Sequence, residues 1–172
     1  MSVDASIEEE KGGVISVTDE NNEETYLYSI LPKDFINEQG LLNVAVVGVF
    51  ADNETNSEDN IVVDSFQKND EFVYLFHEFL DGFGRHSKIV LAQLPQAEEG
   101  SWVYLVDQRV KDLSAAISPQ DIIGGYKVEK GKLTEYAGNP SHELLTKDGI
   151  FQIGIELKNE LITFIKSKYK PN

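Results

Sequence analysis

The chain has 172 residues, 30 acidic against 15 basic side chains, a net charge of −15 and no cysteine. This length fits one domain and is sufficient for a hydrophobic core without covalent staples. The absence of cysteine excludes disulfides, thiolate zinc sites, thiol catalysis and iron–sulfur ligation. A hydrophobic fraction of 41% excludes a chain that is disordered throughout.

The acidic excess is concentrated at the start of the chain, where residues 1–60 hold 14 acids and two bases. This charge opposes direct binding to nucleic acid and to anionic membranes, and it favours a basic protein partner. The predicted partner-binding residues are the four acids of the polar segment 51–60: Asp52, Glu54, Glu58 and Asp59. Solubility alone is the alternative explanation of the charge.

The first half of the chain predicts strands separated by polar turns. Residues 1–12 are expected to form a disordered acidic tail, and residues 13–172 a single α+β domain. Residues 14–17 and 26–31 are predicted strands, and the turn-like residues between them favour a hairpin. Residues 42–50 are apolar on both faces, which predicts a central strand, and residues 61–66 are predicted to form another.

The rest of the chain predicts two amphipathic helices, at about 69–82 and 156–168. The first has phenylalanine and leucine at helical spacing, with Asn69 and Asp70 as candidate N-caps. The remaining predicted strands are residues 88–94, 102–106, 126–129, 132–136 and 150–155. Gly131 favours a hairpin between the third and the fourth of these. The predicted fold class is therefore α+β, with a mainly antiparallel sheet and two principal helices.

One stretch of the first helix is a weak candidate for a metal site. The run from His77 to Asp81 is similar to the helical zinc motif His-Glu-x-x-His, with aspartate in place of the second histidine. Positions i and i+4 share a helix face, so both side chains could reach one ion, with His86 or His142 as a distant third ligand. An ordinary exposed His–Asp pair is the favoured interpretation, so no metal and no cofactor is expected.

Other chemical motifs are missing from the sequence. It contains no phosphate-binding loop, dinucleotide fingerprint or nucleophile elbow. Trp102 and Tyr104 alternate on a predicted strand and share one face, which favours a place in the core over a ligand pocket. The first residues lack the apolar run of a signal peptide, and the longest apolar stretch, residues 41–51, is far shorter than the roughly 20 residues of a membrane span. A cytoplasmic location is expected.

Residues 102–140 have an order of strand and turn formers that supports a resemblance. The segments are Trp102-Val-Tyr104-Leu-Val106-Asp107, Pro119-Gln-Asp-Ile122-Ile123-Gly124, Tyr126-Lys-Val128, Gly131-Lys-Leu133 and Asn139-Pro140. This order resembles that of small uncharacterised bacterial accessory proteins of the type VII secretion-associated kind. The resemblance implies a bacterial accessory protein and supplies no catalytic residues.

The function predicted from the sequence is that of an acidic protein-binding module. Its most concrete form is an immunity-type or secretion-accessory protein that masks a basic partner such as a toxin or a secreted effector. Three alternatives stay open: a DNA mimic that inhibits a nucleic-acid-binding protein, a metal-dependent hydrolase that uses His77 and Asp81, and a structural subunit that docks through its C-terminal amphipathic helix. An enzyme is the less favoured class because no catalytic set is recognised.

Overall fold

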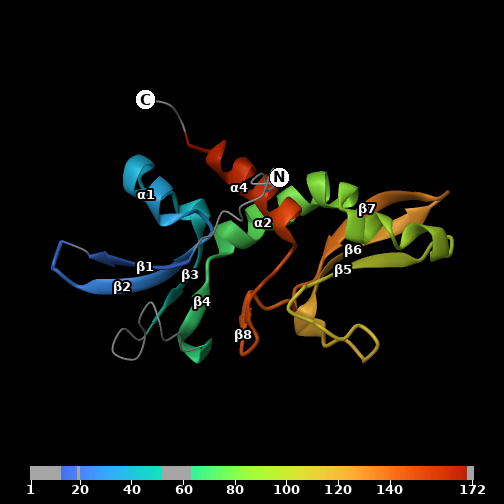
Figure 1. Cartoon of the computed structure of the whole chain (residues 1–172), viewed down its shortest axis with the longest axis horizontal. Helices are drawn as coiled ribbons and strands as arrows, with labels where there is room; N and C mark the ends of the chain where they lie inside the picture. Colours follow the sequence, from blue (N-terminus) through green and yellow to red (C-terminus); the bar gives the residue numbers. More distant parts are fainter. Residues whose placement is uncertain (1–12, 19, 52–62, 170–172) are drawn as a thin grey trace, which may run out of the picture. The chain divides into compact units, whose positions relative to one another are not determined.

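The structure is a computed structural model that describes residues 13–18, 20–51 and 63–169 (Figure 1). The chain divides into two compact units, residues 1–75 with 158–172 and residues 76–157. Helices α2 (Asp70–Phe83) and α4 (Ile155–Lys166) each contribute residues to both units. The prediction of a single domain over residues 13–172 stays a prediction. The acidic tail predicted for residues 1–12 lies outside the described residues.

The first unit contains a four-stranded antiparallel sheet in the order β1-β2-β3-β4. Its elements are β1 (Gly13–Thr18), β2 (Glu24–Ser29), α1 (Lys33–Gln39), β3 (Val46–Phe50) and β4 (Phe66–Lys68). The predicted hairpin is confirmed because β1 pairs with β2. The central position predicted for the apolar strand is confirmed too, since β3 lies between β2 and β4.

Apolar side chains of β1, β2 and β3 form one hydrophobic cluster in the first unit. Ile15, Leu27 and Val46 are buried together, and Ile36 of α1 packs against them. Tyr169, which follows α4, hydrogen-bonds to the segment after α1. Its hydroxyl accepts from the Leu42 amide and donates to the Gly40 carbonyl, both at 3.0 Å. The strand pairing therefore buries the alternating apolar positions that the sequence shows.

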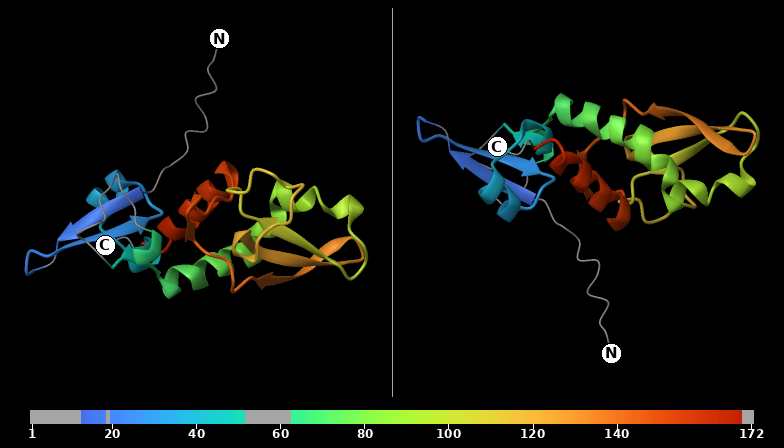
Figure 2. Two further views of the ribbon diagram at one scale, coloured as in Figure 1. Left: turned by 90° about the horizontal axis from the view of Figure 1, so that it is seen from below. Right: turned by 90° about the horizontal axis from the view of Figure 1, so that it is seen from above.

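The second unit contains a three-stranded antiparallel sheet in the order β5-β6-β7 and a small β8–β9 hairpin (Figure 1, Figure 2). Its elements are α3 (Lys88–Leu91), β5 (Trp102–Val106), β6 (Ile122–Glu129), β7 (Lys132–Gly138), β8 (Leu145–Thr146) and β9 (Gly149–Ile150). The predicted β6–β7 hairpin is confirmed. Lys130 and Gly131 have φ values of 52° and 72°, as a tight two-residue turn requires.

One face of the β5–β7 sheet is turned toward α2. Val103, Tyr126 and Tyr136 are cross-strand neighbours on this face. The Tyr126 hydroxyl donates to the Leu80 carbonyl at 2.7 Å, and the Tyr136 hydroxyl lies 2.6 Å from Nδ1 of His77. The second half of α2 therefore covers this face, and the opposite face lacks such a helix within the second unit (Figure 2).

The predicted α+β class with mainly antiparallel sheets and two amphipathic helices is confirmed, and each helix lies within two residues of its predicted bounds. Two predicted strands are wrong. Of the predicted strand 150–155 only Ile150 is in a strand, β9, and Ile155 already begins α4. The other is the predicted strand 88–94. Its first residues form the short helix α3, in which Val90 is buried while Ile89 and Leu91 are both 41% exposed. A three-residue apolar run does not by itself distinguish a strand from a helical turn. No helix in the described ranges is long and apolar enough to cross a bilayer.

Candidate functional site

The helical metal candidates do not come together around one point. Nδ1 of His77 lies 2.6 Å from the Tyr136 hydroxyl, and the Asp81 carboxylate accepts from Arg85 at 2.8 Å, while His86 is exposed. The described residues include no group of three or more histidine, aspartate or glutamate side chains placed to hold a metal ion. The hydrolase alternative thus gains no ligand set in the described part of the chain. The predicted partner-binding acids Asp52, Glu54, Glu58 and Asp59 lie outside it.

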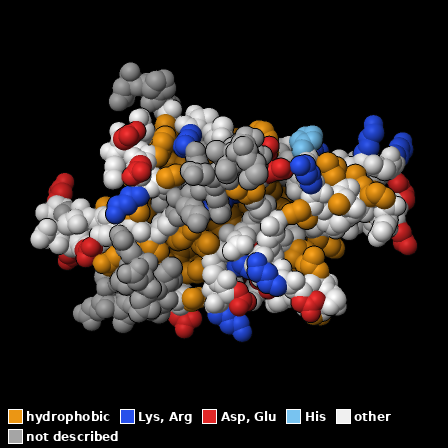
Figure 3. All heavy atoms as spheres, in the orientation of Figure 1, with side chains coloured by type: hydrophobic (Ala, Val, Ile, Leu, Met, Phe, Trp, Pro, Cys, Tyr) orange, Lys and Arg blue, Asp and Glu red, His pale blue; other side chains and the backbone are white. Residues whose placement is uncertain are grey.

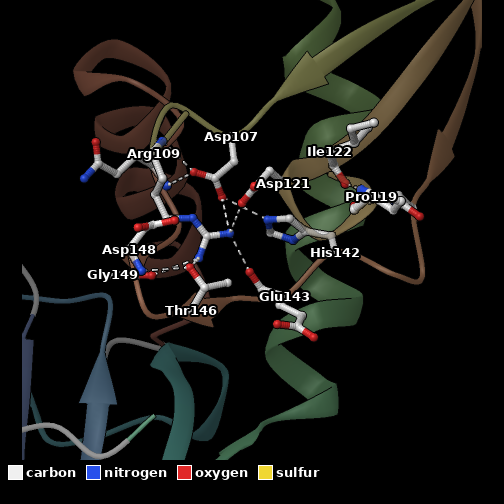
Figure 4. Close-up of polar contacts among 12 residues, drawn as sticks. Asp107, Arg109, Pro119, Asp121, Ile122, His142, Glu143, Thr146, Asp148 and Gly149 are labelled. Atoms are coloured by element: carbon white, nitrogen blue, oxygen red, sulfur yellow. Dashed lines mark hydrogen bonds and ion pairs between the residues drawn. The ribbon is translucent and has the colours of Figure 1, made fainter. Parts of the chain in front are cut away.

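The strongest polar cluster is one that the sequence did not predict, and it surrounds Asp107 directly after β5 (Figure 4). Oδ1 of Asp107 accepts from the backbone amides of Arg109 and Gln152, both at 3.0 Å. Oδ2 lies 3.0 Å from Nη2 of Arg109 and 3.0 Å from Nε2 of His142. The Asp107 side chain is fully buried, and these four contacts satisfy both of its oxygens.

Arg109 extends the same cluster to the β8–β9 hairpin. Its Nη1 donates to the Gly149 carbonyl at 2.8 Å and to the Thr146 hydroxyl at 3.3 Å, and its Nη2 donates to the Glu143 carbonyl at 2.7 Å. A second carboxylate, Asp121, lies 3.6 Å from Nη2. Figure 4 shows the guanidinium at the centre of these groups.

These contacts make the cluster a crosslink between three segments of the second unit: the end of β5, the turn at Asp121 and residues 142–149. The Arg109 side chain is 1% exposed, and its remaining donor, Nε, has no hydrogen-bond partner. The signal in the sequence was a charged pair, Asp107 and Arg109, placed directly after an apolar strand. His142 had been singled out as a distant metal ligand, and the structure instead places it against Asp107.

Two tyrosine hydroxyls under α2 have perturbed ionisation. Burial raises the pKa of Tyr126 well above its usual range, and the nearby Asp81 adds to this effect while Arg85 opposes it. Burial also raises the pKa of Tyr136, reinforced by Tyr126 and Asp81. Both hydroxyls therefore stay neutral in the folded protein over the physiological range.

We expect this burial to destabilise the fold at alkaline pH. A tyrosine whose pKa is raised on folding binds its proton more tightly in the folded state than in the unfolded state. Stability is then lost as pH rises above about 10, by up to about 1.4 kcal/mol per pH unit for each such tyrosine. The measurement is urea unfolding at stepped pH, with Tyr126→Phe as a variant that should show a shallower loss. Ionisation of all seven tyrosines in one step near pH 10 in the folded protein would contradict this.

The other face of the β5–β7 sheet carries aromatic side chains that the sequence had assigned to the core. The rings of Trp102 and Tyr104 both lie over Gly125, where an added Cβ would be 3.4 Å from Cε3 of Trp102 and 3.2 Å from Cδ1 of Tyr104. They share a face as predicted, but the core assignment is wrong for Tyr104, which is 49% exposed. On the same face Lys127 lies opposite Trp102, Glu135 lies opposite Lys127, and Ala137 lies opposite Gly125.

Further exposed apolar side chains of the second unit lie at the end of α2, on α3, which contacts β5, and in the loop after β5. The second unit contains five of the eight large apolar side chains that are exposed in the described residues: Phe83, Ile89, Leu91, Tyr104 and Leu113. Figure 3 shows hydrophobic side chains at the surface of this unit, bordered by charged ones. Side chains of this kind are enriched where proteins bind one another.

Comparison with protein-family models, with curated proteins and with solved structures finds no match for this chain. The resemblance of residues 102–140 to bacterial accessory proteins stays a prediction.

Proposed function

We propose that this chain is an acidic protein-binding module that masks a basic protein partner, in the manner of an immunity-type or secretion-accessory protein. The observation that carries the proposal is the exposed apolar surface around β5, where Tyr104, Ile89 and Leu91 each leave at least two fifths of their surface open. Large apolar side chains supply most of the binding energy at the centre of protein interfaces.

The charge of the chain supports a basic protein as the partner. Residues 1–75 and 158–172 hold 18 acids and seven bases, whereas residues 76–157 hold 12 acids and eight bases. The first unit therefore supplies most of the negative field, which attracts a basic protein over long range and raises its association rate. The second unit has the smaller acidic excess, four charges, and would supply apolar contact.

The test is affinity capture from a lysate of the source organism with the full chain as bait, washed at low and at high salt. We expect one basic protein at stoichiometric amount, released by salt because screening weakens the attraction. Tyr104→Ala should lose that protein, because truncation of a central interface aromatic costs at least about 2 kcal/mol. Tyr74→Ala is the matched control, since Tyr74 of α2 is 77% exposed and lies in the first unit.

Three results would contradict the proposal. The first is an empty capture, and the second is a captured protein that is acidic and indifferent to salt. The third is that the Tyr104→Ala and Tyr74→Ala baits lose the captured protein to the same extent. The contact could then not be assigned to β5.

A further inference from the structure

The outer edge of β5 is closed by a side chain rather than by another strand. In the order β5-β6-β7, β5 is an edge strand. At Tyr104, the backbone N–H donates to Oε1 of Gln93 at 3.3 Å, and the backbone carbonyl accepts from Nε2 of Gln93 at 2.8 Å. Nε2 also lies 3.2 Å from the Ile89 carbonyl, which fixes the side chain between α3 and β5.

The Gln93 amide thus makes the pair of hydrogen bonds that one residue of a neighbouring antiparallel strand would make. A side-chain amide and a backbone residue each offer one N–H group and one carbonyl oxygen. An incoming strand that displaces Gln93, together with the short helix α3 that packs against β5, would leave neither backbone group of Tyr104 unsatisfied. The Gln93 amide makes three contacts with backbone groups, all of them exposed to solvent. When the side chain moves away, water can therefore satisfy the groups that it leaves.

The two edges of this sheet differ in how they are protected. The edge strand β7 carries the charged side chains Lys132 and Glu135, which oppose pairing with another chain. The β5 sequence WVYLV carries no charge, and its edge is flanked by the exposed Ile89 and Tyr104. Pairing at β5 would therefore add apolar side-chain contacts to the backbone hydrogen bonds.

We propose that β5 is the docking strand, and that an extended segment of the basic partner adds to its edge by displacing the Gln93 amide. This inference rests on the proposed function and names its binding mode. A second copy of the chain is disfavoured as the occupant because two molecules of net charge −15 repel each other. Arginine side chains of the incoming segment would lie over the exposed ring of Tyr104 and the half-buried ring of Trp102, where cations bind favourably.

The probe is a short labelled peptide of alternating arginine and valine, titrated into the full chain at about 0.15 M salt, where the Debye length is about 8 Å. Anisotropy of the label measures total binding. Fluorescence of Trp102, the one tryptophan in the chain, measures occupancy of the β5 face. The matched probe has esters in place of its central amides, which removes N–H donors and keeps every side chain and charge.

We expect the amide peptide to bind and to change the Trp102 fluorescence, and the ester analogue to bind about tenfold more weakly, since each net hydrogen bond changes affinity by about two- to tenfold. Gln93→Ala should strengthen binding of the amide peptide by about two- to tenfold, because the competing side chain is gone. Gln96→Ala, at an exposed glutamine three residues further on, should leave binding unchanged.

Each of the other outcomes overturns a defined part of the inference. Equal affinity for the amide and ester peptides would remove strand addition and leave the binding of basic partners intact. An anisotropy change with constant Trp102 fluorescence would place binding elsewhere on the chain, and no effect of Gln93→Ala would remove the displacement step. The absence of any anisotropy change would overturn strand addition at β5 and leave the proposed function to the lysate capture, and dimerisation through β5 in light scattering would make a second copy the occupant.

Discussion

Replacing Arg109 by methionine is expected to lower the free energy of unfolding by about 3–5 kcal/mol, the cost of removing one partner from a buried ion pair. The side chains of Arg109 and Asp107 are 1% and 0% exposed, and Nη2 of Arg109 lies 3.0 Å from Oδ2 of Asp107. Without the guanidinium, Asp107 would keep its contacts with His142 and two backbone amides but lose its cation. The carbonyls of Glu143 and Gly149 would lose their donor.

The control for this experiment is Lys111→Met, which removes the same charge two residues away at an exposed position. Its long contact to the Gln108 carbonyl, at 3.4 Å, is expected to contribute less than about 0.5 kcal/mol. Both variants are compared with the parent chain by urea unfolding, followed by the fluorescence of Trp102 and by circular dichroism. Similar midpoints for Arg109→Met and Lys111→Met would mean that the cluster does not crosslink the second unit.

A second large effect is expected at Gly84, in the turn after α2. A Cβ at this position would overlap the hydroxyl of Tyr126 and lie 3.3 Å from Cδ2 of Leu80. Tyr126 is fully buried, and its hydroxyl donates to the Leu80 carbonyl at 2.7 Å. Gly84→Ala should therefore combine overpacking with the loss of a buried hydrogen bond, and lower stability by about 2–4 kcal/mol.

The neighbouring Gly82 provides a matched substitution with the opposite sign. It lies within α2, and a Cβ there would meet no atom within 4 Å. Gly82→Ala should raise stability by about 0.5–1 kcal/mol because alanine has the higher helix propensity. Thermal unfolding of the two variants beside the parent chain is the measurement. A stable Gly84→Ala variant would show that the Tyr126 ring can move aside without cost.

The sequence predicted helix α2 correctly, but it did not predict which elements pack against that helix. Phenylalanine and leucine at helical spacing require a helix, because no other backbone gathers them on one face. The partners of that face come from strands more than 40 residues away, such as Tyr126 and Tyr136. The sequence indicates that Phe76 and Phe79 are buried, but only the tertiary structure decides what they are buried against, as where the ring of Phe76 lies 5.0 Å from that of Phe151.

The same limit applies to Trp102 and Tyr104, for which the sequence predicted a shared face but not whether that face is exposed. Alternation correctly placed Trp102 and Tyr104 on one face of a strand, since side chains repeat every two residues. Whether that face is buried depends on which face of the sheet α2 covers. The strand predicted for residues 88–94 was wrong for a related reason, because a short apolar segment is compatible with either a helix or a strand. The hydrogen bonds between Gln93 and β5 join distant residues, so they cannot be read from the local sequence.

The sequence by itself determined the α+β class, both long helices, the two hairpins and the acidic charge. These features depend on local periodicity, turn residues and composition, which need no knowledge of distant partners. The tertiary structure decided the cluster around Asp107, the open face beside Tyr104 and the position of Gln93 at the edge of β5. Each of these joins residues that are 11 to 45 positions apart, because strand register and chain reversal, rather than neighbouring residues, fix which polar groups meet.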